Sequence, residues 1–501
     1  MQAEDYGNEA IGKGSTVKKL VRHGGLYFSA KILGRLPRFA VLPVYTAFLP
    51  PAQYGMYATT LASAELLAIF MGLRIDAAFG RYFFDLNSSR AELKRLVSTC
   101  LIFVVSFGLF VSSIGLVAGY HYHHNVLGIP FLVLIVPVVV SRLVAQVALI
   151  SRTYFSNTHR SRIIAVTDVV GNILGPVVAV ILLVNTRMRV SAIAVSLLLG
   201  ALVPCIVGLV VMRREGLLGL CLDMLILRKC VYFGLMFLPG VAAAWIYTVS
   251  DRIIITVYEG NAETGIYSIA YQLGKVVSHV AESVNMVYMP ILLARLSTNY
   301  KQGLESLRKP IVAMVWLMLF VCSSFSLFAS EILHVMTDSQ YHGGTPIMIV
   351  VIWSFMWGGI YWPFLNLLYY HKKVLLIGAI GIFSAAVNLV LNLAFVPIYG
   401  KMAAAWTTLA ASIAYAGLVI IFAYRLNRPP IDWKELGKTG LIWGGLFVCH
   451  YFVRSIVMPS WLSVVVRISL IFLALCMTVG LDLLGSRKIL REYVFRSHMK
   501  P

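Results

Sequence analysis

Fourteen long apolar runs occupy almost the whole of this 501-residue chain. Most are close to the ~20 residues that an α-helix needs to cross a bilayer, and they leave no room for a sizeable water-soluble domain. A helix satisfies its own backbone polar groups inside the bilayer, so the chain is predicted to be an all-α polytopic membrane protein with about fourteen transmembrane helices. The expected spans are 24–48, 55–75, 96–118, 127–150, 163–184, 191–212, 231–257, 265–293, 310–329, 345–369, 374–396, 402–424, 437–457 and 462–484.

The charge balance supports this interpretation and fixes an orientation. Only 13% of the residues are charged, against about 25% in a typical soluble protein. A net charge of +21 would ordinarily suggest nucleic acid as a partner. Here most Lys and Arg fall on one side of the membrane, and the opposite loops carry only Arg187, Arg189, Lys401 and Arg454. The positive-inside rule therefore places both termini in the cytoplasm, and no nucleic acid is expected as a partner.

A repeated motif divides the chain into two halves. The sequence Tyr54-Gly55-Met56-Tyr57-Ala58 recurs as Thr264-Gly265-Ile266-Tyr267-Ser268, at an offset of 210 residues. Both copies begin on the cytoplasmic side, so the repeat is parallel, and such lobes are related by an axis along the membrane normal. The expected divisions are an N-terminal tail (1–23), an N-lobe (24–212), a cytoplasmic amphipathic linker (213–230), a C-lobe (231–424), two extra spans (437–484) and a C-terminal tail (485–501).

The first apolar run contains three cations, Lys31, Arg35 and Arg38. Steps of four and three residues place them on one helix face. A charge at bilayer depth costs roughly 2.5–3.5 kcal/mol on insertion scales, so each must face protein or water. The three cations predict a wet, cationic cavity that holds an anionic ligand.

Span 265–293 carries a polar stripe that is expected to face the same cavity. Its members are Tyr271, Lys275, Ser278, Glu282 and Asn285. The repeat relates Lys275 to Glu65. The two could form an ion pair across the lobe interface that holds in one conformer and breaks in the other, or a static structural pair.

Two more charged pairs lie within spans. Arg142 and Asp168 lie in consecutive spans and could form an ion pair within the N-lobe. Asp251 and Arg252 are adjacent in sequence, so their side chains leave a helix about 100° apart and can contact two different neighbours.

Other polar residues are interpreted as structural. Asn388 and Asn392 share one face of a span and are expected to hydrogen-bond between helices. His121, His123 and His124 cluster in a short outside loop, for which a solvated loop is preferred over a metal site.

No phosphate-binding loop and no catalytic arrangement is found, so neither an ATPase nor an enzyme is expected, and no cofactor is implied. Active transport would then need an ion gradient, with buried acids that take up and release protons. The candidate gating or ion-coupling residues are Glu65, Asp168, Asp251 and Glu282.

Three motifs resemble those of a known family. Leu49-Pro50-Pro51-Ala52-Gln53-Tyr54-Gly55-Met56-Tyr57 is similar to the L-x-P-x-x-Y-G-x-Y pattern of polysaccharide flippases, and Asp251-Arg252, Gly260 and Gly265-Ile266-Tyr267-Ser268 resemble their second-lobe pattern. Gly72-Leu73 followed by Gly80-Arg81-Tyr82 resembles a third. With the topology, the chain is similar to the Wzx-type flippases of the MOP exporter superfamily.

The resemblance implies that the chain flips undecaprenyl-diphosphate-linked oligosaccharides across the bacterial inner membrane, for exopolysaccharide, O-antigen or capsule synthesis. It also implies alternating access around a cationic cavity, contact with membrane lipids, and a polysaccharide polymerase and a chain-length regulator as candidate partners. The candidate substrate-binding cations are Lys31, Arg35, Arg38, Arg142, Arg252 and Lys275.

Three alternatives stay open at this stage. Lipid II flippases share the fourteen spans and the cationic cavity. Multidrug exporters of the MATE family usually have twelve spans and an acidic cavity, which is the opposite sign. The third alternative is a membrane scaffold of a polysaccharide synthesis complex that transports nothing.

Overall fold

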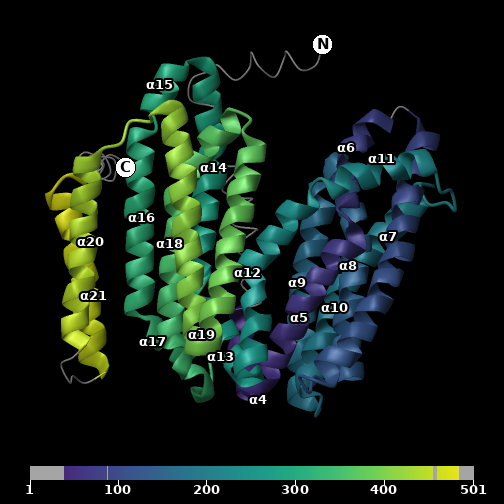
Figure 1. Ribbon diagram of the computed structural model, residues 1–501, viewed down its shortest axis with the longest axis horizontal. Helices are drawn as coiled ribbons and strands as arrows, with labels where there is room; N and C mark the ends of the chain where they lie inside the picture. The colour runs from purple at the N-terminus through teal and green to yellow at the C-terminus, as the bar shows by residue number, and fades with distance from the viewer. Residues whose placement is uncertain (1–38, 87–88, 455–459, 484–501) are drawn as a thin grey trace, which may run out of the picture.

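The computed structural model describes residues 39–86, 89–454 and 460–483, and every regular element in these ranges is helical. Two bundles of helices stand side by side, and a separate helix pair lies beyond the second bundle (Figure 1). The first bundle comprises α5 (Pro51–Gly72), α6 (Ile75–Leu86), α7 (Arg90–Ala118), η2 (Gly119–His124), η3 (Phe131–Ile135), α8 (Val136–Asn157), α9 (Ser161–Asn185) and α10 (Arg189–Arg214).

The second bundle follows a connecting helix, α11 (Met224–Leu235). It comprises α12 (Leu238–Glu259), α13 (Asn261–Gly274), α14 (Val276–Thr298), α15 (Tyr300–Glu305), α16 (Arg308–Leu327), α17 (Ala329–Met336), η4 (Ser339–Gly344), α18 (Thr345–Tyr370) and α19 (Val374–Asn427). The remaining elements are the short α4 (Leu42–Phe48), which precedes α5, and the pair α20 (Trp433–Arg454) and α21 (Ser460–Gly480).

Eleven helical stretches among the described residues are long and apolar enough to cross a membrane. The stretch that contains α19 covers two of the expected spans, 374–396 and 402–424. Between them Gly400 takes a positive φ of 63°, which interrupts the helical backbone. The all-α membrane fold is therefore confirmed, while the count of fourteen spans stays a prediction. Large apolar side chains such as Phe110 and Val117 on α7 are 61% exposed, as expected of a surface that faces lipid.

The connection between the bundles differs from the expected linker. An amphipathic helix was expected over 213–230, but the chain from Glu215 to Asp223 is not helical. Gly216 has a positive φ of 66°, and the Asp223 carboxylate accepts hydrogen bonds from the backbone of Leu225 and Ile226, so a new helix begins only at α11. This segment is tied to α7 of the first bundle, where Ser98 Oγ donates to the Leu217 carbonyl at 3.3 Å.

Glu215 anchors the start of this connection. Its carboxylate accepts hydrogen bonds from Tyr154 on α8 and from Arg160 in the α8–α9 turn. Partial burial alone would raise the pKa of Glu215, but these hydrogen bonds and the Arg160 charge lower it below its ordinary value. The anchor is an ionised carboxylate at neutral pH.

The last two helices form a separate layer against α16. Trp443 of α20 is fully buried and packs edge-on against Trp316 and Phe320 of α16. Arg467 of α21 is paired with Glu331 of α17. Helices α20 and α21 pack against the second bundle, on its side away from the first bundle (Figure 1).

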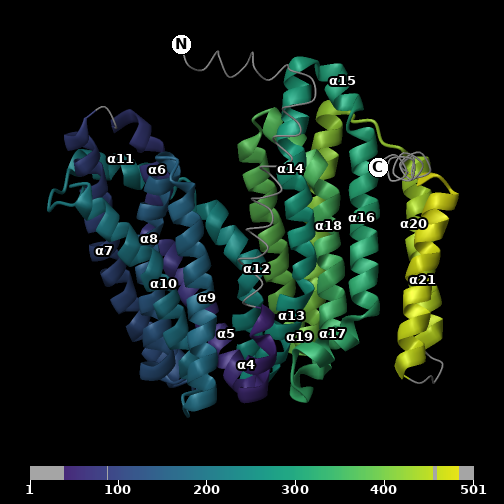
Figure 2. The same cartoon turned by 180° about the vertical axis from the view of Figure 1, so that it is seen from behind.

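The two bundles meet at one end of the molecule. Both views show α4, α5, α12 and α13 gathered at that end, while the ribbons of the bundles diverge toward the end that carries α11 (Figure 2). A single buried apolar cluster runs across the meeting point and joins Leu42 and Tyr54 to Tyr267 and Tyr341. The interface is thus a packed core at this end.

Candidate functional site

The contact between the bundles, here called the seam, is built on two repeat-related glycines. Gly55 on α5 and Gly265 on α13 lie at the crossing of the two helices. A methyl group on Gly55 would overlap the carbonyl oxygen of Asn261, and one on Gly265 would overlap the carbonyl oxygen of Pro51. Pro51 and Asn261 are themselves repeat-related, so the contact is reciprocal and obeys the pseudo-twofold symmetry of the chain. Only glycine permits this approach of two backbones.

Hydroxyl groups continue the seam along α5 and α12. Thr59 Oγ1 lies 2.5 Å from Thr256 Oγ1, which lies 2.7 Å from Thr264 Oγ1 on α13. All three side chains are buried. One turn further along, Trp245 Nε1 donates to the Ala62 carbonyl at 3.0 Å. The seam is therefore a buried contact in which these hydroxyl and indole groups form hydrogen bonds.

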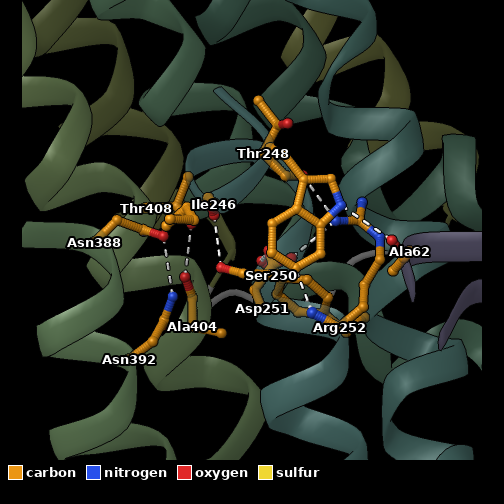
Figure 3. A network of polar contacts seen from close by, with 12 residues as sticks. Ala62, Ile246, Thr248, Ser250, Asp251, Arg252, Asn388, Asn392, Ala404 and Thr408 are labelled. Carbon is orange, nitrogen blue, oxygen red and sulfur yellow. Dashed lines mark hydrogen bonds and ion pairs between the residues drawn. The ribbon is translucent and has the colours of Figure 1, made fainter. Parts of the chain in front are cut away.

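A charged group lies beside this seam on α12. Arg252 Nη1 donates to Asp251 Oδ1 at 2.8 Å and to the Thr248 carbonyl at 2.9 Å (Figure 3). The second carboxylate oxygen of Asp251 accepts from Tyr267. The guanidinium stands 4.6 Å from the ring centroid of Tyr271, which adds a cation–π contact. Asp251 and Arg252 thus contact two different tyrosines of α13, and Arg252 also folds back along its own helix onto Asp251.

Glu65 approaches this group from the other bundle. It lies on α5, one turn beyond Ala62, within Coulombic range of the Arg252 guanidinium. Between the described residues there is no ion pair from Glu65 to Lys275 in this conformation. Lys275 is half-buried and lies where α13 and α14 meet.

A buried polar belt extends from α12 to α19. Thr407 Oγ1 donates to Asn392 Oδ1 at 2.6 Å, and Asn392 Nδ2 donates to Asn388 Oδ1 at 3.1 Å, so these residues join the two arms of α19. The expected interhelical hydrogen bond is therefore seen for Asn392, whereas Asn388 bonds within its own arm. Tyr247 of α12 lies 2.6 Å from the Ser412 hydroxyl of α19. Figure 3 shows the asparagines and the Asp251–Arg252 group at neighbouring positions.

The polar stripe of span 265–293 does not present one common face. Tyr271 is buried beneath Arg252, and Asn285 accepts a hydrogen bond of 2.7 Å from Asn366 of α18. The helices α13 and α14 meet at Lys275, which keeps right-handed helical dihedral angles and donates its N–H to the Tyr271 carbonyl at 2.9 Å. The two buried members of the stripe pack against neighbouring side chains, so the stripe is not a single open face.

Two of the expected acids are not deeply buried. Asp168 keeps about a third of its side chain exposed, at 35%, and pairs with Arg152 instead of Arg142. Glu282 is 38% exposed and lies 3.6 Å from His279 on the same helix. The expected deep burial of these two carboxyls is therefore wrong, whereas Asp251 is only 2% exposed.

The remaining predicted residues fall outside the seam. Arg142 is half-buried on α8 in the first bundle, away from Asp168. Lys31, Arg35 and Arg38 lie outside the described residues, so the cationic face of the first run stays a prediction. His123 contacts the Ser63 hydroxyl at 2.8 Å.

Sequence reasoning missed several seam residues. Thr59, Thr256 and Trp245 drew no attention, because an isolated threonine or tryptophan in a membrane span is ordinary. Tyr267 was quoted only as part of a motif. Its repeat partner Tyr57 marked it as equivalent to another position, but gave no sign that its hydroxyl would reach Asp251.

Two parallel lobes and an extra helix pair define the MOP superfamily fold. The lipid II flippase MurJ in an inward closed conformation is similar, with a TM-score of 0.70 and 14% identity over 91% of this chain and 99% of that one. An inward-facing multidrug resistance transporter of the MATE family gives 0.63 and 11%, over 79% and 94%. The Vibrio cholerae MATE transporter VcmN in its bent form gives 0.51 and 12%, over 85% and 99%. Identities this low establish the fold alone.

The family follows from the sequence itself. The model of the polysaccharide biosynthesis proteins matches residues 20–297, which is more than half of the chain, and the chain belongs to that family. No curated protein sequence gives a significant match. The proteins of similar fold named above are transporters rather than enzymes.

Proposed function

We propose that this chain flips polyprenyl-diphosphate-linked oligosaccharides across the membrane by alternating access. Membership of the polysaccharide biosynthesis family supports a lipid-linked sugar as cargo, and the MurJ-like fold supports flipping of a polyprenyl lipid. The observation that carries the proposal is the reciprocal Gly55–Gly265 crossing, because it closes the lobes at one end while they diverge at the other. A transporter of this kind reverses the arrangement in its second state.

The seam end is proposed to face outside. The charge distribution places Val126, between η2 and η3, outside and Leu220, in the connection before α11, in the cytoplasm. Val126 is 66% exposed and Leu220 fully exposed, so each is a suitable labelling site. In a background without the native cysteines, Val126→Cys should react with an impermeant maleimide in cells with a permeabilised outer membrane, and Leu220→Cys should not. The reverse pattern would overturn the proposed orientation.

Arg252 is proposed as the described cation that senses the diphosphate. Arginine binds phosphate oxygens through two parallel hydrogen bonds, which lysine cannot reproduce. In this structure Asp251 neutralises the guanidinium, so an arriving diphosphate would compete for it. Arg142 and Lys275 are secondary candidates on either side. Lys31, Arg35 and Arg38 are proposed to provide the main cationic face from the first span.

Ion coupling is proposed to act through the same group. Asp251 and Glu65 both lie close to Arg252, one in each bundle. Proton uptake by either would weaken its attraction to the guanidinium and shift the balance between the two states. Asp168 and Glu282 are weaker candidates, because both are more exposed.

Reconstitution tests the function directly. Purified protein in liposomes that contain a fluorescent polyprenyl-diphosphate oligosaccharide should expose the sugar on the opposite face. Arg252→Gln and the triple change Lys31→Ala, Arg35→Ala and Arg38→Ala should each reduce the rate at least tenfold at unchanged protein level. Full activity of both variants would contradict the proposed site. No flipping by the native chain would favour a scaffold, and preference for lipid II would favour the lipid II flippase alternative.

A further inference from the structure

Two histidines at the seam end stack on each other. His334 on α17 and His342 on η4 have ring centroids 3.7 Å apart, with their planes tilted by 33°. Each ring already donates one N–H to a backbone carbonyl: His334 Nδ1 to Ser330 at 2.7 Å, and His342 Nε2 to Thr337 at 3.3 Å. These bonds fix both rings in place and assign one proton to each. The stack therefore suits neutral imidazoles.

The stack lies beside the contacts that hold α4 to the second bundle. The backbone N–H of Asp338 donates to Thr46 Oγ1 at 3.1 Å, and the Tyr341 hydroxyl donates to the Leu49 carbonyl at 2.7 Å. Tyr341 also packs edge-on against Tyr54, at a ring distance of 6.3 Å. Through these contacts η4 binds the segment that immediately precedes the Gly55 crossing. His342 is the residue after Tyr341 on η4.

We infer that the His334–His342 stack is a pH-sensitive latch that keeps the seam end closed while the outside is neutral or alkaline. The inference rests on the proposed function, since it assumes that the seam end opens during transport. A second proton would place two positive charges face to face at 3.7 Å, and this repulsion would drive the rings apart. Displacement of η4 from α17 then releases Tyr341 from Leu49 and frees the outer end of α4.

Few other charges act on the two rings. On α17, Glu331 is engaged by Arg467 of α21, and on η4 the Asp338 carboxylate accepts from the backbone of Gln340. On α13, which packs against η4, Glu263 pairs with Lys401. Within the described part of α4, and over 345–351 of α18, the only ionisable group is the Tyr45 phenol.

The latch predicts that acid opens the seam end. The test uses the full chain in nanodiscs without substrate, so it reports on the latch even if the cargo differs from the one proposed. Spin labels at Val126→Cys and Tyr399→Cys, which are 66% and 67% exposed on the two bundles, report the separation of their outer ends. Lowering the pH from 8.0 to 5.5 should raise the long-distance population at least threefold.

Variants separate the latch from other titrating groups. His334→Gln and His342→Gln should each abolish the acid-induced opening while the seam stays closed at both pH values. His342→Arg should move the opening to a higher pH, because its permanent charge leaves a single proton on His334 sufficient for repulsion. His121→Gln is the matched control, an outside histidine with no contact to η4, and should respond like the native chain. A native chain without a pH response, or a response that survives in the His334→Gln/His342→Gln double variant with an unchanged melting temperature, would overturn the latch.

Discussion

The two copies of the repeated motif are alike at one end of their helices and different at the other. Around Gly55 and Gly265 the copies are interchangeable, since each glycine packs on the backbone carbonyl that starts the opposite helix. Ten residues further on, α5 continues through Glu65 to Gly72, whereas Lys275 lies where α13 ends and α14 begins. The symmetric part makes a contact that needs no side chain. The divergent part carries an acid, Glu65, in one lobe and a base, Lys275, in the other. The two lobes therefore differ in charge beside a contact that they share.

The largest expected effect comes from the symmetric part. Gly55→Ala and Gly265→Ala should each prevent closure of the seam, because the added methyl meets a backbone oxygen that cannot move aside. Overpacking costs roughly 1–3 kcal/mol where side chains can relax, so at least a tenfold loss of the closed population is expected here. Flipping in liposomes should fall accordingly, and equally for the two variants. Gly378→Ala is the matched control, since open space surrounds that position. A large difference between Gly55→Ala and Gly265→Ala would break the symmetry argument.

The charged group beside the seam should have its main effect on stability and not on closure of the seam. Asp251→Asn leaves Arg252 buried without its counter-ion, and removal of one partner of a buried pair costs about 3–5 kcal/mol. The double variant Asp251→Asn/Arg252→Gln should be milder, because no unpaired charge remains. Thermal unfolding in detergent measures the difference between the single and double variants. A double variant less stable than Asp251→Asn alone would mean that the pair is not what stabilises this site.

The fold could be predicted from the sequence because membrane spans are recognisable by the length and hydropathy of their apolar runs. The repeat offset also identified Gly55 and Gly265 as equivalent. Equivalence does not imply contact, however, and nothing in the sequence showed that the two glycines meet. The Arg142–Asp168 prediction failed for a geometric reason. The α8–α9 hairpin turns near Thr158, so Asp168 lies opposite Arg152, and Arg142 is about 15 Å further along α8.

Local packing and backbone geometry explain the other failures. The polar stripe of span 265–293 was expected to face one cavity, but Tyr271 lies beneath Arg252 and Asn285 accepts a hydrogen bond from Asn366. The predicted linker helix over 213–230 was also wrong. Gly216 takes a positive φ, and Asp223 caps the next helix, so helical structure resumes only at α11. Apolar periodicity carries no information on either event. The Arg252 cation–π contact was also out of reach, because it depends on which way a long side chain folds.

A double-mutant cycle sharpens the divergent half of the comparison. Glu65→Gln and Arg252→Gln should be coupled by about 1 kcal/mol in this conformation, because Glu65 lies near Arg252. The proposed Glu65–Lys275 pair would then belong to the opposite conformation. In that case the swap of Glu65→Lys with Lys275→Glu should recover part of the flipping rate that each single change removes. Strictly additive losses without rescue would show that Glu65 and Lys275 never meet.

The smallest expected effect lies in the connection between the lobes. Glu215→Gln removes a carboxylate whose pKa is lowered in the folded protein, chiefly by its hydrogen bonds from Tyr154 and Arg160 acting against burial. A depressed folded pKa adds stability above the unfolded pKa, and that stability is lost as the pH falls through the folded value. The variant should therefore melt a few degrees lower at pH 7 and match the native chain near pH 3. A gap that stays constant with pH would assign the effect to packing.

Reversible locking of the seam tests alternating access most directly. Thr59 and Thr256 sit on opposite bundles with their hydroxyl oxygens 2.5 Å apart, so cysteines at both positions should form a disulfide in a background without the native cysteines. Oxidation should trap the closed seam and stop flipping of the fluorescent lipid-linked oligosaccharide, and dithiothreitol should restore it. Each single cysteine variant should flip normally under both conditions. Undiminished flipping by fully cross-linked protein would contradict the account, because the seam would then not need to open.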